Sequence, residues 1–183
     1  IMDNVFVFYA GTGEASGGPA SSVWPHAWEL SQAGKSFTVD GILVDHYACT
    51  CELQGSQPDG IGTFCHEFSH IMGLPDLYNT YSSGVNYTPG EWTIMDYGSY
   101  NNNSRTPPSY SAYERNAMGW LDMQEVVEGV SLSLEDIKTS NHAVAIASSK
   151  PKEFYLLENR QQSSWDTYLP NHGMLIWHVD YDA

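Results

Sequence analysis

The chain has 183 residues, with 7 lysines and arginines against 22 aspartates and glutamates, which gives a net charge of −15. Hydrophobic residues make up 42% of the sequence and aromatic residues 13%, which is enough for a folded core and too much for a disordered chain. An acidic surface without a basic cluster argues against nucleic acid and anionic membranes as partners, and no apolar run is long enough to span a membrane.

Both ends of the sequence are strand-like. The apolar run 5–9 (VFVFY) begins almost at once, with no signal peptide before it, and residues 174–181 form a similar run close to the last residue. We therefore expect a piece of a longer precursor. On that expectation, the absence of a signal peptide says nothing about the compartment.

Between the first strand and the first helix, residues 37–47 are predicted to form a strand after a glycine-rich loop. The cysteines Cys49, Cys51 and Cys65 form an odd set without a CxxC pair. This pattern favours neither a disulfide framework nor a four-cysteine zinc site. We interpret them as three small thiols, buried or half-buried.

Residues 61–72 are predicted to form a helix, because their apolar residues recur at intervals of three and four. Asp59 is the candidate N-cap, and Gly73 stands where a helix ends in a left-handed residue. The apolar face of this helix is expected to anchor it in the core.

The helix carries the motif HExxH as His66-Glu67-Phe68-Ser69-His70. Residues four apart lie one turn above another, so His66 and His70 project from one face and can hold one zinc ion. Glu67 lies beside them, where a carboxylate can act as general base on a water molecule. The motif therefore predicts a hydrolytic zinc site.

The continuation of the motif supplies a third ligand. Gly73 allows a sharp turn after the helix, so that Asp76, three residues further on, can return to the metal. Asp76 could also be a turn residue after Pro75 or a calcium ligand. The rival third ligand is Glu114, in a second predicted helix at 109–118, as in thermolysin-like enzymes, although Glu114 is also spaced for a capping box with Ser111.

A second landmark is the segment 92–98 (WTIMDYG). A methionine in a tight turn beneath the zinc histidines is typical of the metzincin peptidases, and Met95 takes that place, although a lone methionine is often core filling. Tyr97, two residues later, could direct its hydroxyl to the metal or donate a hydrogen bond to a tetrahedral oxyanion. It could equally stack on the substrate cleft or be merely exposed.

The rest of the chain is rich in strands. We expect an α/β (α+β) metzincin-like catalytic domain at 1–125, with part of its N-terminal portion missing, followed by a truncated β-rich, sandwich-like module at 126–183. The predicted strands of this module lie at 126–130, 132–134, 143–147, 154–157 and 174–179.

These segments together resemble a known family. The stretches 61–78 (IGTFCHEFSHIMGLPDLY) and 91–100 (EWTIMDYGSY) are similar to the immune inhibitor A-type secreted metallopeptidases of bacteria, and the likeness extends to 3–18, 23–26, 113–121 and 155–180. The resemblance implies a zinc endopeptidase, exported and made as a precursor, that often carries structural calcium. Asp96 is one carboxylate that could hold calcium.

The predicted reaction is hydrolysis of peptide bonds in protein or peptide substrates. His66, His70 and Asp76 would hold the zinc, and Glu67 would pass a proton from water to the leaving amine. His26 and His178 are candidates for supporting or interdomain hydrogen bonds. The alternative function is that of a catalytically inactive fragment, or a binding or adhesion module that retains the peptidase fold.

Overall fold

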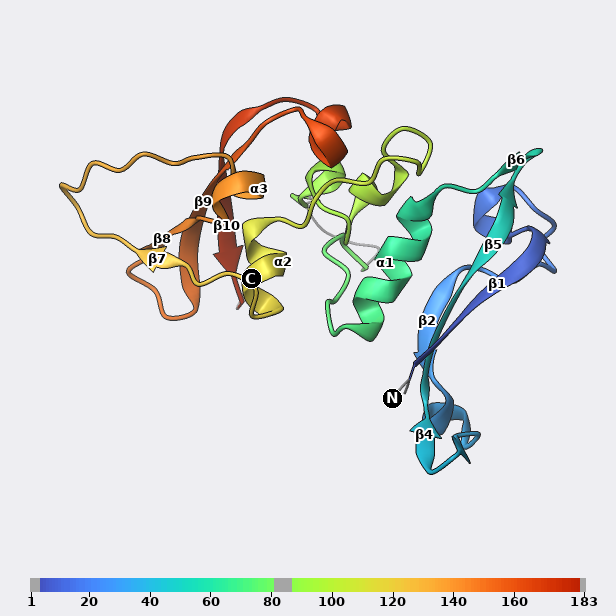
Figure 1. Cartoon of the computed structure of the whole chain (residues 1–183). Helices are drawn as coiled ribbons and strands as arrows, with labels where there is room; N and C mark the ends of the chain where they lie inside the picture. Colours follow the sequence, from blue (N-terminus) through green and yellow to red (C-terminus); the bar gives the residue numbers. More distant parts are fainter. Residues whose placement is uncertain (1–3, 81–86, 182–183) are drawn as a thin grey trace.

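The computed structural model describes residues 4–80 and 87–181. Two four-stranded β-sheets lie at opposite ends of the molecule, and the helix α1 (Ile61–Ile71) lies between them, next to the first sheet (Figure 1). The first sheet contains β1 (Asn4–Thr12), β2 (His26–Glu29), β5 (His46–Gln54) and β6 (Gln57–Pro58).

Strand β5 is the centre of the first sheet. It pairs with β1 in parallel and with β2 in antiparallel orientation. The short β6 pairs in antiparallel orientation with the C-terminal end of β5. Cys49 and Cys51 of β5 are buried, Cys65 of α1 is half-buried, and all three are free thiols. The predicted state of the cysteines is therefore confirmed.

The predicted strand at 37–47 is wrong as a single element. The structure has a hairpin instead, β3 (Phe37–Val39) and β4 (Ile42–Val44), before β5 begins. Asp40 and Gly41 at its tip both have positive φ, 50° and 78°. Two consecutive left-handed residues form the tight turn that reverses a strand, and an aspartate–glycine pair is well suited to it.

The predicted active-site helix is confirmed as α1, but its N-cap is Gly60 and not Asp59. The Asp59 carboxylate accepts hydrogen bonds from the Gly60 amide at 2.9 Å and from the Thr50 hydroxyl at 3.4 Å, so it caps the loop before the helix. The amide of Gly62 instead donates to the Ser104 carbonyl at 2.7 Å. A free amide of the first turn is thus satisfied by a distant loop.

Helix α1 packs closely on both sides. Phe64 packs against Phe6 of β1, with ring centroids 4.5 Å apart. On the side of the later loops, a Cβ atom at position 62 would overlap the carbonyl oxygen of Ser99, so glycine is needed there. The buried residues of α1 are Gly62, Glu67 and Ser69, whereas Phe68, on the apolar face that was expected to anchor the helix, is 37% exposed.

The segment after α1 is irregular in its described residues, apart from the short 3-10 helices η3 (Gly90–Trp92) and η4 (Tyr97–Tyr100). Residues 81–86 of this segment lie outside the described ranges. Asn102, Asn103 and Ser104 are three successive left-handed residues, with φ of 51°, 54° and 62°. This turn presents the Ser104 carbonyl to the start of α1.

The second predicted helix is shorter than expected, α2 (Ala112–Ala117), and the capping box between Ser111 and Glu114 is confirmed. Gly119, with φ of 71°, follows its end. The strands predicted at 126–130 and 132–134 are wrong: these residues have no strand structure. The remaining elements are β7 (Gln124–Glu125), α3 (Ile137–Ser140), β8 (Val144–Ala147), β9 (Glu153–Arg160), η5 (Ser164–Tyr168) and β10 (Gly173–Asp180).

The second sheet has the strand order β10-β9-β8-β7, and α2 packs against it. Ala112 of α2 belongs to the same buried cluster as Leu121, Ile137 and Leu156. The division of the chain at residue 125 stays a prediction. Among the described residues, every helix is too short or too polar to cross a membrane.

Candidate metal centre and active site

Three predicted ligands converge beside the C-terminal half of α1. Oδ1 of Asp76 lies 3.2 Å from Nε2 of His66 and 3.2 Å from Nε2 of His70. Gly73, with φ of 103°, makes the turn that returns the chain to the helix. The three side chains form a group able to hold one metal ion.

The Nδ1 atom of each imidazole makes a hydrogen bond. Nδ1 of His66 bonds to the Ile94 carbonyl oxygen and Nδ1 of His70 to the Leu74 carbonyl oxygen, both at 2.8 Å. A carbonyl oxygen can only accept, so each Nδ1 carries the proton. In its neutral form, each ring therefore turns the lone pair of Nε2 toward Asp76.

The chemistry of the three donor atoms fits a cation. Oδ1 of Asp76 is buried and makes no hydrogen bond, although two nitrogens lie near it. Three lone pairs that face one another repel unless a proton or a metal ion lies among them. A tetrahedral zinc ion with ligand bonds of about 2 Å separates its ligand atoms by about 3.3 Å, which matches the 3.2 Å observed.

The same proximity shifts the pKa values of the group. Burial opposes ionisation of Asp76, but the imidazoles of His66 and His70 outweigh it and hold its pKa well below the ordinary value. Burial lowers the pKa of His70, and the Asp76 carboxylate more than offsets this, so the pKa is raised. Without a metal ion, a proton on His70 relieves the repulsion.

Glu67 lies on the same helix and is buried, with 7% of its surface exposed. Burial raises its pKa, and the neighbouring His66 and His70 only partly offset that effect. A raised pKa is the property that a group needs in order to accept a proton and later release it near neutral pH. Glu67 also lines a cavity beside His66.

Met95 lies in the turn formed by residues 93–96 and is fully buried. It packs in one cluster with Leu74 and Ile94. Its carbonyl oxygen accepts from the Leu77 amide at 2.8 Å. The turn therefore fixes the segment that carries Asp76 as well as the Ile94 carbonyl that orients His66.

Glu114, the rival third ligand, is not in the metal group. Its carboxylate is fully buried and accepts hydrogen bonds from the amide and hydroxyl of Ser111, at 2.6 and 2.8 Å, and from the Met95 amide at 3.3 Å. Burial raises its pKa to about 7, against these hydrogen bonds. Glu114 therefore supports the turn beneath the site.

A cavity of about 260 Å³ opens beside His66 and Glu67. Tyr97, the predicted hydroxyl donor, lines it and is 61% exposed. Two further tyrosines that sequence reasoning missed, Tyr78 and Tyr100, line it as well.

Tyr78 contacts the metal group. Its ring stacks on His66, with centroids 6.4 Å apart. Burial and the charge of Asp76 raise its pKa to about 12. The sequence could have indicated Tyr78, because it follows Asp76 by two residues in the segment that returns toward α1.

The other predicted residues make ordinary structural contacts. Nε2 of His26 bonds to the Tyr47 hydroxyl at 2.8 Å, and Nε2 of His178 to the Glu153 carboxylate at 2.7 Å. Asp96, the calcium candidate, accepts from the amides of Gly90 and Tyr97 at 2.6 and 2.8 Å.

A buried glutamate beside two histidines and a carboxylate on one helix and its return turn is the arrangement of a metallopeptidase centre. Comparison of the sequence with known proteins agrees. The chain belongs to the immune inhibitor A peptidase M6 family, whose catalytic domain matches residues 1–123.

Two relatives extend this result. Pre-pro-metalloprotease PrtV of Vibrio cholerae is 24% identical over 161 residues, which cover 80% of this chain and 17% of that protein. Immune inhibitor A of Bacillus thuringiensis subsp. alesti is 27% identical over 122 residues, covering 61% of this chain and 18% of that protein. The chain thus spans less than a fifth of the length of these relatives.

Proposed function

We propose that the chain carries the active site of a zinc-dependent endopeptidase of the metzincin type. The observation that carries the proposal is the convergence of His66, His70 and Asp76, with both Nδ1 atoms bonded to carbonyl oxygens and Oδ1 of Asp76 buried without a hydrogen bond. When bound, a zinc ion would polarise the scissile carbonyl and lower the pKa of the attacking water.

The residues of the chain divide the remaining tasks. Glu67 accepts a proton from the attacking water and delivers it to the leaving amine, for which its raised pKa is suited. A tyrosine hydroxyl in the cavity, of Tyr97 as predicted or of Tyr78, donates a hydrogen bond to the oxygen on which charge develops. The cavity holds a substrate side chain beside Glu67.

We also propose that the natural protein is an exported precursor. The support is the family membership and the name of the Vibrio relative, which describes a pre-pro form. Structural calcium stays a prediction without an assigned set of ligands.

The decisive experiment joins metal content to activity. We expect one zinc ion per purified chain and cleavage of a quenched peptide library that stops when a chelator is added and resumes with zinc. Glu67→Gln should keep the zinc and lose about two to four orders of magnitude in rate.

A matched control is Glu52→Gln, since Glu52 lies on β5 and accepts a hydrogen bond from the Gly11 amide. It removes one carboxylate outside the site and should leave cleavage unchanged. One zinc ion per chain without any cleavage would favour the binding-module alternative. An active Glu67→Gln variant would refute the mechanism.

A further inference from the structure

A buried ion pair between the second sheet and η5 holds the segment that leads into α2. Arg160, the last residue of β9, and Asp166 in η5 are both fully buried. Nε and Nη2 of Arg160 donate to the two carboxylate oxygens of Asp166 at 2.9 and 2.8 Å. Two parallel bonds of this kind fix the relative position of both side chains.

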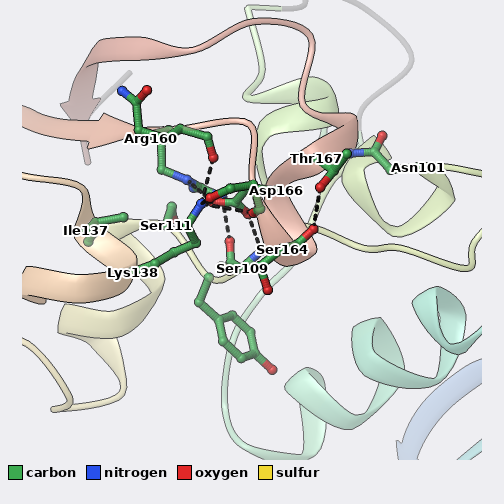
Figure 2. A network of polar contacts seen from close by, with 12 residues as sticks. Asn101, Ser109, Ser111, Ile137, Lys138, Arg160, Ser164, Asp166 and Thr167 are labelled. Atoms are coloured by element: carbon green, nitrogen blue, oxygen red, sulfur yellow. Dashed lines mark hydrogen bonds and ion pairs between the residues drawn. The ribbon is translucent and has the colours of Figure 1, made fainter.

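This pair holds Ser109 by its backbone. The Ser109 amide donates to Oδ1 of Asp166 at 2.8 Å, and the Ser109 carbonyl accepts from Nη2 of Arg160 at 2.9 Å. Figure 2 shows Ser109 beside Arg160 and Asp166, with Lys138 on the neighbouring side. Nζ of Lys138 lies 3.6 Å from Asp166 and offsets part of the buried negative charge.

Tyr110, the next residue, reaches from this segment to the active-site helix. Its hydroxyl lies 2.7 Å from the hydroxyl of Ser69, which is fully buried and precedes His70 in the sequence of α1. Ser69 donates its only hydroxyl proton to the Cys65 carbonyl at 2.6 Å. Tyr110 must therefore be the donor in its contact with Ser69.

Tyr110 is itself fixed from two further sides. Nε of Arg115 donates to the Tyr110 carbonyl at 2.9 Å, and the ring of Trp120 meets the tyrosine ring edge to face, with centroids 5.5 Å apart. The hydroxyl of Tyr110 thus has one defined position against α1.

Arg160 and Asp166 lie beyond residue 123, where the family match ends.

We propose that Tyr110, held through Ser109 by the Arg160–Asp166 pair, is a positioning residue for the HExxH helix. The second sheet then supports the catalytic centre through Ser109 and Tyr110, on the side of α1 away from the first sheet. The expected effect on zinc affinity rests on the proposed function. The expected effect on the stability of α1 does not.

The test compares Tyr110→Phe with Tyr113→Phe in the chain. Both variants remove one hydroxyl from neighbouring tyrosines, but the Tyr113 hydroxyl is paired with Tyr181 and not with α1. We expect Tyr110→Phe to speed amide hydrogen exchange in the second half of α1 about fivefold, as the loss of one hydrogen bond allows. Its zinc dissociation constant should rise about tenfold.

A double-mutant cycle separates the bond from general packing. In the Ser69→Ala background, Tyr110→Phe should have no further effect on exchange or zinc affinity. Asp166→Asn, if it folds, should loosen the same half of α1. If Tyr110→Phe matches Tyr113→Phe in both measurements, or if Asp166→Asn loosens only β9 and η5, the proposal is overturned.

The exchange measurement needs no metal. A chain in which α1 depends on Tyr110 but which binds no zinc would refute the proposed function and still support this positioning role.

Discussion

The Ile94 carbonyl oxygen accepts a hydrogen bond from Nδ1 of His66 at 2.8 Å. The bond fixes the tautomer and ring orientation of His66, a proposed zinc ligand, although Ile94 lies 28 residues further along the chain. The position of that carbonyl depends on Met95, the next residue, whose side chain is fully buried.

Met95→Ala should therefore weaken the site as well as the fold. We expect a loss of about 2–5 kcal/mol in the free energy of unfolding, because the truncation leaves a cavity, and weaker zinc binding because the Ile94 carbonyl shifts. Met95→Leu conserves volume and should cost less than about 1.5 kcal/mol. Chemical denaturation and chelator competition measure both effects. If the two variants bind zinc with equal affinity, Met95 does not position the metal site.

Asp76→Ala should lower zinc affinity at least about 100-fold, since even the partners of metal ligands contribute 10–100-fold. Glu114→Ala, measured beside it, should change zinc affinity far less because its carboxylate bonds to Ser111 and Met95. Titration with zinc against a competing chelator decides between the two carboxylates. The reverse ranking would restore Glu114 as the third ligand.

Asp76 should also make stability depend on acid pH in the metal-free chain. Its pKa is lowered in the folded state, so its ionised form stabilises the fold above the ordinary aspartate pKa. That contribution is lost as the pH falls through the folded-state value. Thermal unfolding of the parent and of Asp76→Asn between pH 5 and pH 2 should therefore converge toward low pH.

The two tyrosine candidates can be separated by kinetics. Because Tyr78 stacks on His66 and keeps its proton up to a pKa of about 12, we expect Tyr78→Phe to lower kcat about 100-fold with little change in KM. Tyr97 is 61% exposed, and Tyr97→Phe should act mainly on KM. The opposite split would assign the oxyanion role to Tyr97.

Glu114 predicts a second dependence of stability on pH, with the opposite sign. Its pKa is raised to about 7 in the folded state, so folding retains a proton that the unfolded chain releases. Its stabilisation is complete below the unfolded pKa of about 4.5 and is lost as the pH rises through about 7, by about 3 kcal/mol. The difference in unfolding free energy between the parent and Glu114→Gln should fall over this range. A difference that is independent of pH would contradict the burial effect.

The sequence predicted the elements whose signal is local. The helix α1, one residue shorter than predicted, the left-handed Gly73 after it and the Ser111–Glu114 capping box of α2 all follow from local spacing, and they are confirmed. The convergence of Asp76 on the histidines also followed, because a glycine turn and a three-residue return define it.

Contacts between segments that are distant in the sequence could not be predicted from local spacing. The cap at Gly62 comes from Ser104, 42 positions away, so Asp59 was the reasonable local choice. Residues 127–134 include β-branched and apolar side chains but form no strand, since strand pairing depends on partners and not on propensity. Ser69 gave no signal of its burial because its partner, Tyr110, lies 41 positions further on.

The close approach of Gly62 to the Ser99 carbonyl oxygen has a use in searching genomes. A side chain at that position would force α1 away from η4, so a working site of this design should carry glycine four positions before its first histidine. The search pattern then lengthens from HExxH to GxxxHExxHxxGxxD. A pattern anchored on backbone clearance as well as on ligands should discard most chance occurrences of the short motif.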